Sequence, residues 1–188
     1  LKSPNYIPCK NRRNIQSIVI HYTGMRSLQS AVERLLSKKY EVSSHYVIGR
    51  TGKVLQLVKD NNIAWHAGIS NWFHVKNLNK NSIGIELENK GHQYGYQNFP
   101  SKQITQLIKI LKMLKKKFNI QNTNIIGHSD IAPGRKTDPG EKFPWKKLYK
   151  NDLAIWHSLD EKFINNFRLK KLKNINKKNM LRMIKKLG

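Results

Sequence analysis

Short runs of β-branched and other apolar residues alternate along this chain with two longer stretches of helical periodicity. The expected strands lie near residues 17–22, 45–48, 54–58, 83–88 and 124–127. The two helices are expected after Ser27 and at Ser101, whose hydroxyls suit an N-cap, and their apolar residues recur every three or four positions. Strands that alternate with helices favour a mixed central β-sheet with helices packed on it. The sequence therefore predicts an α/β fold with a single domain.

The composition divides the chain into three parts. Residues 1–16 contain Pro4 and Pro8, show no periodicity, and are expected to form an extended lead-in. Residues 17–158 contain the alternating strands and helices, and their length suits one domain with its own core. Residues 159–188 form a basic tail with ten Lys or Arg side chains, which we expect to be helical in part.

A polar loop is expected directly after the strand near 124–127. Its Pro and Gly residues predict that it forms neither helix nor sheet. Within this loop His128 and Asp138 stand ten positions apart, and Lys136 lies two residues before the aspartate. Imidazole and carboxylate groups bind Zn²⁺, and three protein ligands plus a water make a catalytic zinc site. The loop thus predicts two ligands of a metal site that needs a third.

The best third ligand is His21, which stands near the end of the expected strand at 17–22. With His128 and Asp138 it would hold one tetrahedral Zn²⁺ ion and leave an open position for water. If no metal binds, the two histidines would merely occupy strand ends. The pattern does not exclude a different histidine as ligand, although one inside a strand, such as His45, is expected to be structural. The other candidates are His45, His66, His74, His92 and His157.

Four sequence blocks carry a family resemblance. They read IHYT at 20–23, AWHAG at 64–68, SIGIELEN at 82–89 and GHSDIAPGRKTDPG at 127–140. With these blocks in this order, the chain resembles the zinc-dependent N-acetylmuramoyl-L-alanine amidases of the peptidoglycan-recognition fold. The resemblance implies hydrolysis of the amide bond between the lactyl group of N-acetylmuramic acid and L-alanine, in peptidoglycan or muropeptides.

Two residues are the candidate catalytic groups. The strand at 83–88 places Gly84, Glu86 and Glu88 on one face, and Gly84 would leave room there for a metal and substrate. Glu86 is the candidate general base, and Glu88 on the same face is the alternative. The resemblance matches Glu86 to the catalytic glutamate of the family. It matches Lys136 to the lysine that stabilises the oxyanion.

Four further residues are candidate substrate contacts. The resemblance matches Trp65 and His66 to residues of the substrate cleft. Arg135 has a guanidinium fork that suits a peptide carboxylate. Some relatives place a tyrosine-based device on the hairpin strand, where this chain has Tyr46, so Tyr46 is included.

The net charge is 36 − 11 = +25, which ordinarily indicates a nucleic acid or an anionic surface as partner. The cations are 28 Lys and only 8 Arg, and they accompany 20 Asn, which indicates a general bias toward Lys and Asn. Specific nucleic-acid readers rely on Arg forks, so we expect no specific nucleic acid partner. Contact between the basic tail and an anionic wall or membrane surface is the preferred use of the charge. The alternative functions are a non-catalytic muropeptide-binding module and a basic protein that binds anionic surfaces or nucleic acid.

The compartment is predicted from the resemblance alone. The single Cys9 forms no intrachain disulfide, and no apolar run approaches the ~20 residues of a membrane span. Because the chain starts at Leu1 rather than Met, we expect a leader to have been removed. The stretches at 88–99 and 143–156 resemble the envelope branch of the family more than its cytoplasmic recycling branch. We therefore expect the cell envelope or periplasm, with the cytoplasm as the alternative.

Overall fold

The computed structural model describes residues 1–157, 159, 160 and 162. Residues Leu1–Ile155 form one compact unit, and Trp156–Gly188 form a second. The basic tail predicted at 159–188 therefore lies almost entirely outside the described residues. Among the described helices, none combines the length and the hydrophobicity of a membrane span.

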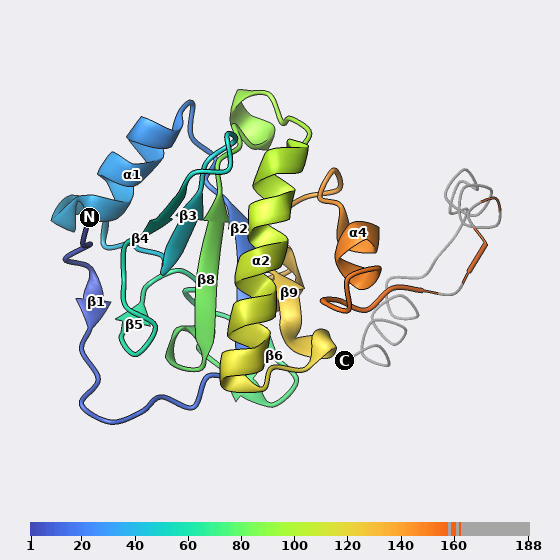
Figure 1. Ribbon diagram of the computed structural model, residues 1–188. Helices are drawn as coiled ribbons and strands as arrows, with labels where there is room; N and C mark the ends of the chain where they lie inside the picture. The colour runs from blue at the N-terminus through green and yellow to red at the C-terminus, as the bar shows by residue number, and fades with distance from the viewer. Residues whose placement is uncertain (158, 161, 163–188) are drawn as a thin grey trace. The chain divides into compact units, whose positions relative to one another are not determined.

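A five-stranded sheet with the strand order β4-β3-β8-β2-β9 forms the centre of the first unit (Figure 1). Its strands are β2 (Ser17–Tyr22), β3 (Tyr46–Ile48), β4 (Val54–Gln56), β8 (Ser82–Leu87) and β9 (Ile125–Gly127). Strands β3, β8, β2 and β9 run parallel, and β4 joins β3 as an antiparallel hairpin partner. This arrangement confirms the predicted mixed sheet.

Shorter elements surround the sheet. Two small antiparallel pairs are formed by β1 (Tyr6–Ile7) with β5 (Ile63–Ala64), and by β6 (Asn71–Trp72) with β7 (Val75–Lys76). The α-helices are α1 (Leu28–Leu36), α2 (Ser101–Phe118), α3 (His128–Ile131) and α4 (Trp145–Tyr149). The 3-10 helices are η1 (Lys38–Tyr40), η2 (Leu78–Lys80), η3 (His92–Tyr94) and η4 (Asn122–Asn124).

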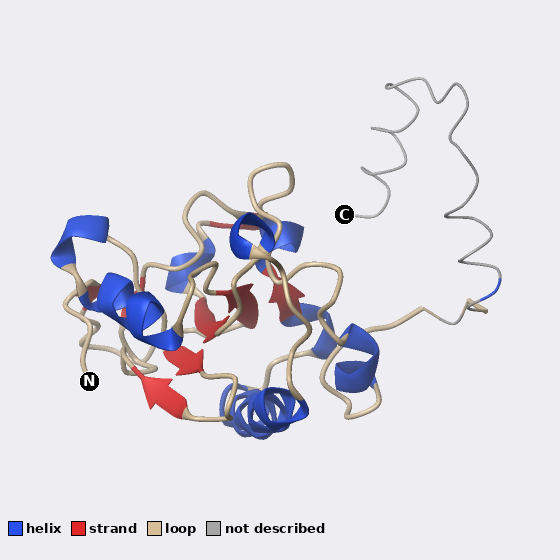
Figure 2. Ribbon diagram, turned by 90° about the horizontal axis from the view of Figure 1, so that it is seen from above, coloured by secondary structure: helices blue, strands red, loops and turns tan. Residues whose placement is uncertain are grey.

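The central strands are buried on both faces, and α2 lies along one face (Figure 2), where Leu148 of α4 joins the same buried cluster. On that side Ile85 of β8 belongs to the same buried cluster as Leu107 and Leu111 of α2. On the other side Val19 of β2 packs with Leu78 and with residues of α3. Side chains of one strand alternate between two faces, so the alternate residues of β2 and β8 are left for the second face.

The two long helices begin differently. Ser27 caps α1 as predicted, because its side chain accepts a hydrogen bond from Ser30 N. Ser101 is instead the first residue of α2, and Pro100 stands at the N-cap without a side-chain hydrogen bond. The predicted cap is therefore one residue out of place. Proline suits this position because its backbone is already extended.

The loop after β9 differs from the prediction in its first turn. Residues His128–Ile131 form the short helix α3, whereas the sequence analysis predicted no helix there. The reason is that the first proline comes at Pro133, which leaves room for one turn. Asp130 secures this turn, since its carboxylate accepts a hydrogen bond from Gly127 N at 2.7 Å.

The segment expected to be an extended lead-in contains the short strand β1 and packs into the first unit through buried residues such as Ser3 and Arg13. Its buried Arg13 donates hydrogen bonds to backbone carbonyls of the connection that precedes β8 and of β8 itself. The accepting carbonyls belong to Asp60, Asn62, Asn79, Lys80 and Ser82. The guanidinium group of Arg13 therefore links the two ends of the connection between β4 and β8.

We predict that Arg13→Met lowers the free energy of unfolding by about 3 kcal/mol or more, because several buried carbonyls lose their charged donor. Urea unfolding monitored by circular dichroism measures this change. The control is Arg12→Met, since Arg12 is exposed and has the same charge and size. Equal stability of the two variants would contradict the assigned role of Arg13.

Candidate metal centre and cleft

Three buried ligand atoms converge at the carboxyl ends of β2 and β9. His21 Nδ1 lies 2.9 Å from His128 Nδ1 and 3.0 Å from Asp138 Oδ2. His128 Nδ1 lies 3.1 Å from the same carboxylate oxygen. Among the described residues, this is the group of three that could hold a metal ion. The structure thus brings together the three predicted ligands, and no alternative histidine joins them.

The parallel strands deliver these ligands. In the register of β2 and β9, Ile20 pairs with Gly127, so His21 and His128 follow at neighbouring strand ends. The loop beyond α3 then returns, and the carbonyl of Asp138 accepts a hydrogen bond from Ser129 N at 2.8 Å. This bond brings the Asp138 side chain back to the histidines across ten residues.

The segment at 66–67 contacts the other ring nitrogen of each histidine. His128 Nε2 lies 3.1 Å from the carbonyl oxygen of Ala67, which also accepts a hydrogen bond from Arg135. A carbonyl only accepts, so His128 carries its proton on Nε2 and presents an unprotonated Nδ1 to Asp138. His21 Nε2 lies 3.1 Å from His66 Nδ1.

The charge states suit a cation. Burial lowers the pKa of His21 to about 4, so this ring is neutral at pH 7. Burial on its own raises the pKa of Asp138, but the close His128 and His21 rings outweigh burial and lower this pKa, so the carboxyl is ionised. Two neutral imidazoles and one carboxylate are a donor set typical of zinc and related divalent transition metals. The residues present therefore fit a metal ion.

Glu86 stands beside His21 in the register of β8 with β2. Its pKa is raised well above the usual value, mainly by burial and then by the charge of Asp138. Within the described part of the chain, its buried Oε2 atom has no hydrogen-bond partner. A buried carboxyl group with an unused oxygen at a metal centre has the properties of a general base.

The alternative base, Glu88, is engaged elsewhere. Its two carboxylate oxygens accept hydrogen bonds from Leu28 N at 3.0 Å and from Arg50 N at 2.8 Å. Glu88 therefore secures the start of α1 and the turn after β3. This arrangement favours Glu86 as the base.

The space beside Glu86 is filled differently from the prediction. We expected Gly84 to leave room for a metal and substrate, but the room is taken by the ring of His66. A Cβ atom built on Gly84 would lie only 2.4 Å from His66 Cγ. His66 is 9% exposed and contacts His21, so it lies mainly behind the metal ligand, although it reaches the cleft wall.

The cleft extends from the metal centre between α1 and the loops around it. The predicted substrate contacts Trp65 and Arg135 and the predicted oxyanion lysine Lys136 line this cleft. Trp65 is half-buried, while Arg135 and Lys136 are exposed. Lys136 lies close enough for its positive charge to act on both His21 and Glu86.

Tyr46 is not brought to this cleft. It pairs with Ile85 in the register of β3 with β8, so its side chain lies in the core on the α2 side of the sheet. Its hydroxyl donates a hydrogen bond to Asp60 at 2.7 Å. Val47, the next residue, stands opposite Glu86 instead.

Two supporting groups were not predicted from the sequence: the carbonyl of Ala67 and the hydroxyl of Ser82. Ser82 Oγ lies 3.2 Å from His66 Nε2. The alternation on β8 already placed Ser82 on the face of Gly84 and Glu86, so this signal was present in the sequence. Nothing in the sequence pattern pointed to the carbonyl of Ala67.

Residues 11–141 match the family described as N-acetylmuramoyl-L-alanine amidase. The chain belongs to this family. It is 40% identical over 154 residues to the N-acetylmuramoyl-L-alanine amidase AmiD of Escherichia coli, an alignment that covers 76% of the chain but only 55% of AmiD. It is 32% identical over 165 residues to the 1,6-anhydro-N-acetylmuramyl-L-alanine amidase AmpD of Haemophilus influenzae, covering 78% of the chain and 88% of that protein.

Solved structures share the fold. The complex of E. coli AmiD with anhydro-N-acetylmuramic acid-L-Ala-D-gamma-Glu-L-Lys superimposes with a TM-score of 0.74 at 33% identity, covering 92% of this chain and 71% of AmiD. AmpDH3 of Pseudomonas aeruginosa in complex with anhydromuramic pentapeptide gives 0.73 at 29% identity, covering 92% and 73%. The predicted fold class and family resemblance are both confirmed.

The buried histidines predict an acid-labile metal-free protein. Burial lowers the pKa of His21 to about 4 and of His45 to about 3 from 6.5, and lowers that of His66 as well. Below pH 6.5 the unfolded chain binds protons that the folded protein does not, so stability falls as the pH drops toward 4. Each histidine contributes at most about 1.4 kcal/mol per pH unit.

Glu86 opposes this effect, because its raised pKa lets the folded protein bind a proton that the unfolded chain has lost. Urea unfolding of chelator-treated protein at pH 6.5 and 5.0 should therefore show a loss of stability that is steeper in Glu86→Gln than in the wild type. A stability that is constant or higher at pH 5.0 would show that these histidines are not buried as neutral rings.

Proposed function

We propose that this chain is a zinc-dependent hydrolase of the amide bond between the lactyl group of N-acetylmuramic acid and L-alanine in peptidoglycan or its muropeptide fragments. The observation that carries the proposal is the convergence of His21, His128 and Asp138 beside the buried carboxyl of Glu86. The family membership and the muropeptide ligands of the AmiD and AmpDH3 structures support the substrate class.

His21, His128 and Asp138 would hold the zinc ion. When bound, zinc supplies Lewis acidity, which activates a water molecule and polarises the amide carbonyl. Glu86 takes the proton of the attacking water and passes it to the leaving amine of L-alanine. Burial suits both steps, since a base with a raised pKa holds the proton until the amine leaves.

Lys136 and the cleft residues handle the rest of the substrate. The ammonium of Lys136 stabilises the negative charge that develops on the carbonyl oxygen. Arg135 is anchored on the carbonyls of Ala67 and Ile69 and offers its remaining donors to a peptide carboxylate. Trp65 provides an apolar wall for the sugar or peptide.

The first test compares the wild type and Glu86→Gln on a purified muramyl peptide, with release of the L-alanine amine as the readout. We expect the variant to lose about 10²–10⁴-fold in kcat, because it cannot move the proton. Chelator treatment should abolish cleavage and added zinc should restore it. Glu33→Gln is the matched control, because Glu33 is exposed on α1, and it should cleave at the wild-type rate.

The same experiment separates the enzyme from a non-catalytic muropeptide-binding module. A binding module would bind the muramyl peptide in a zinc-loaded, folded state and release no amine. That result would overturn the proposed hydrolysis and leave the metal centre as a recognition device.

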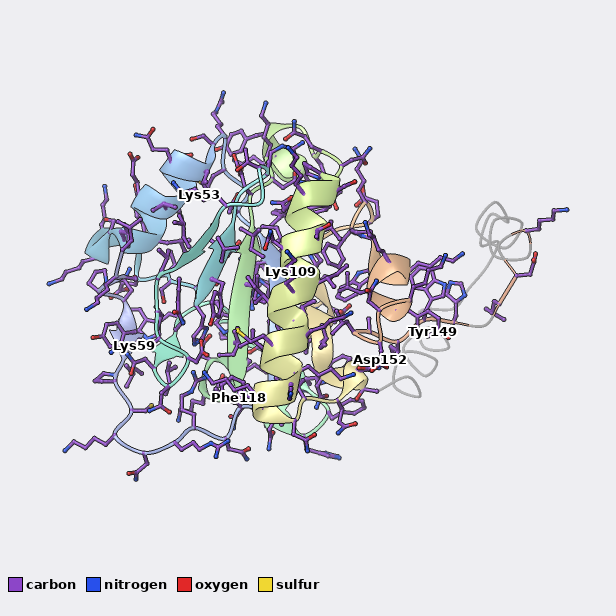
Figure 3. All side chains as sticks on the ribbon, in the orientation of Figure 1. Lys53, Lys59, Lys109, Phe118, Tyr149 and Asp152 are labelled. Carbon is purple, nitrogen blue, oxygen red and sulfur yellow. The ribbon has the colours of Figure 1, made fainter. Side chains whose placement is uncertain are left out.

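Lys136→Met should lower kcat about 10²–10³-fold, corresponding to about 3 kcal/mol of lost transition-state stabilisation, with zinc content unchanged. Steady-state kinetics on the same peptide provides the measurement. The control is Lys109→Met on α2 (Figure 3), since α2 packs on the opposite face of the sheet. An increase in KM with kcat unchanged would assign Lys136 to substrate binding rather than to the oxyanion.

We also propose that the protein acts in the cell envelope. The likeness of the stretches at 88–99 and 143–156 to the envelope branch supports this, with the cytoplasm as the alternative. Fractionation of cells that produce the natural full-length protein tests it, and recovery with cytoplasmic markers alone would contradict it.

A further inference from the structure

A chain of hydrogen bonds runs from the metal ligand His21 into the protein. His21 Nε2 lies 3.1 Å from His66 Nδ1, and His66 Nε2 lies 3.2 Å from Ser82 Oγ. Ser82 Oγ donates to the carbonyl oxygen of Leu78 at 2.6 Å. The three side chains are buried, so these contacts are shielded from bulk solvent.

The position of each proton in this series of hydrogen bonds follows from the final acceptor, the Leu78 carbonyl. The Leu78 carbonyl only accepts, so the hydroxyl of Ser82 must give it its single proton. Ser82 Oγ can then only accept from His66, which places the proton of His66 on Nε2. His66 Nδ1 is therefore unprotonated and accepts the Nε2 proton of His21. The consequence is an unprotonated His21 Nδ1, which is the atom that faces His128 and Asp138.

The surroundings hold the His66 ring in this position. The ring lies against Gly84, where any side chain would collide with it. The backbone N–H groups of His66 and Ala67 donate to Asn79 Oδ1 at 3.0 and 2.7 Å. The ring of His45 packs edge-on against it with centroids 5.7 Å apart. His66 is thus fixed as a support, with one nitrogen assigned to each neighbour.

We propose that His66 and Ser82 are positioning residues that fix the tautomer of His21 and thereby set the affinity of the site for its metal. Without them, His21 can place its proton on Nδ1 and donate it to Asp138, which closes the site to a cation. Supporting hydrogen bonds of this kind are typically worth 10–100-fold in metal affinity. The proposal rests on the metal centre of the proposed function and not on the reaction.

Long-range ¹H–¹⁵N spectra of the metal-free protein at pH 7.5 test the tautomers directly. In the wild type, His21 and His66 should both carry their proton on Nε2. In His66→Phe, which keeps a ring against Gly84 but has no acceptor, His21 should shift toward the form with the proton on Nδ1. A proton on Nδ1 of His21 in the wild type would overturn the proposal.

Competition with a chelator of known zinc affinity tests the consequence. We expect His66→Phe to bind zinc 10–100-fold more weakly. His66→Asn should stay within a few-fold of the wild type, because its Oδ1 atom replaces Nδ1 as acceptor. Ser82→Ala should fall between them, since His66 can then turn its proton toward His21.

The double variant His66→Phe/Ser82→Ala separates positioning from general packing. If Ser82 acts only through His66, the double variant binds zinc no more weakly than His66→Phe alone. Additive losses, or equal affinity in all variants, would overturn the proposal. Thermal unfolding of the metal-free proteins checks folding, and if His66→Phe does not fold, the wild-type spectra and Ser82→Ala carry the test.

These measurements use no substrate. A wild type that binds zinc with the expected tautomers but cleaves nothing would overturn the proposed amidase activity and leave the role of His66 and Ser82 intact.

Discussion

The structure depends on bringing three hydrogen-bond acceptors to one point inside the protein. Two imidazole nitrogens and a carboxylate oxygen lie within 3.1 Å of one another, an arrangement that a cation bound between them would stabilise. Parallel strands provide two of these groups at neighbouring ends, and the loop after α3 returns the third. The connection before β8 supplies the partners that hold the rings, and Arg13 in turn holds that connection. Buried polar contacts therefore connect the metal centre to the strands and loops that position it.

Strand β8 shows that one short strand can contribute to both the hydrophobic core and the site. Ile83, Ile85 and Leu87 face the core beneath α2, while the intervening positions serve the site. Glu86 presents its carboxyl to the cleft, and Gly84 contributes by having no side chain. Six residues thus supply both a share of the hydrophobic core and a share of the chemistry. This division follows directly from the two-residue period of a strand.

Much of this could be predicted from the sequence. The sheet, both long helices and the three candidate ligands followed from periodicity, from turn residues and from four short blocks that resemble the family. The predictions that were wrong concern contacts between segments that are distant in the sequence. Gly84 was expected to make room for substrate, and only the folded connection reveals that His66 fills the space. Tyr46 was a candidate for the cleft, but the register of β3 turns it to the core, and a shift of one residue decides between the two faces.

The positions of the few acidic residues determine how far they offset the positive charge at the surface. Asp138 and Glu86 belong to the metal centre, Asp130 and Glu88 accept backbone hydrogen bonds, and Asp60 bonds Tyr46 and Lys117. Four of them, Asp60, Glu86, Glu88 and Asp138, are buried or half-buried, whereas Asp130 is exposed. On the described part of the surface an anionic molecule therefore meets more exposed lysines than exposed carboxylates. For the muropeptide substrate proposed above, whose free carboxylates are negative, this charge would accelerate encounter by long-range attraction that fades as salt shortens the Debye length.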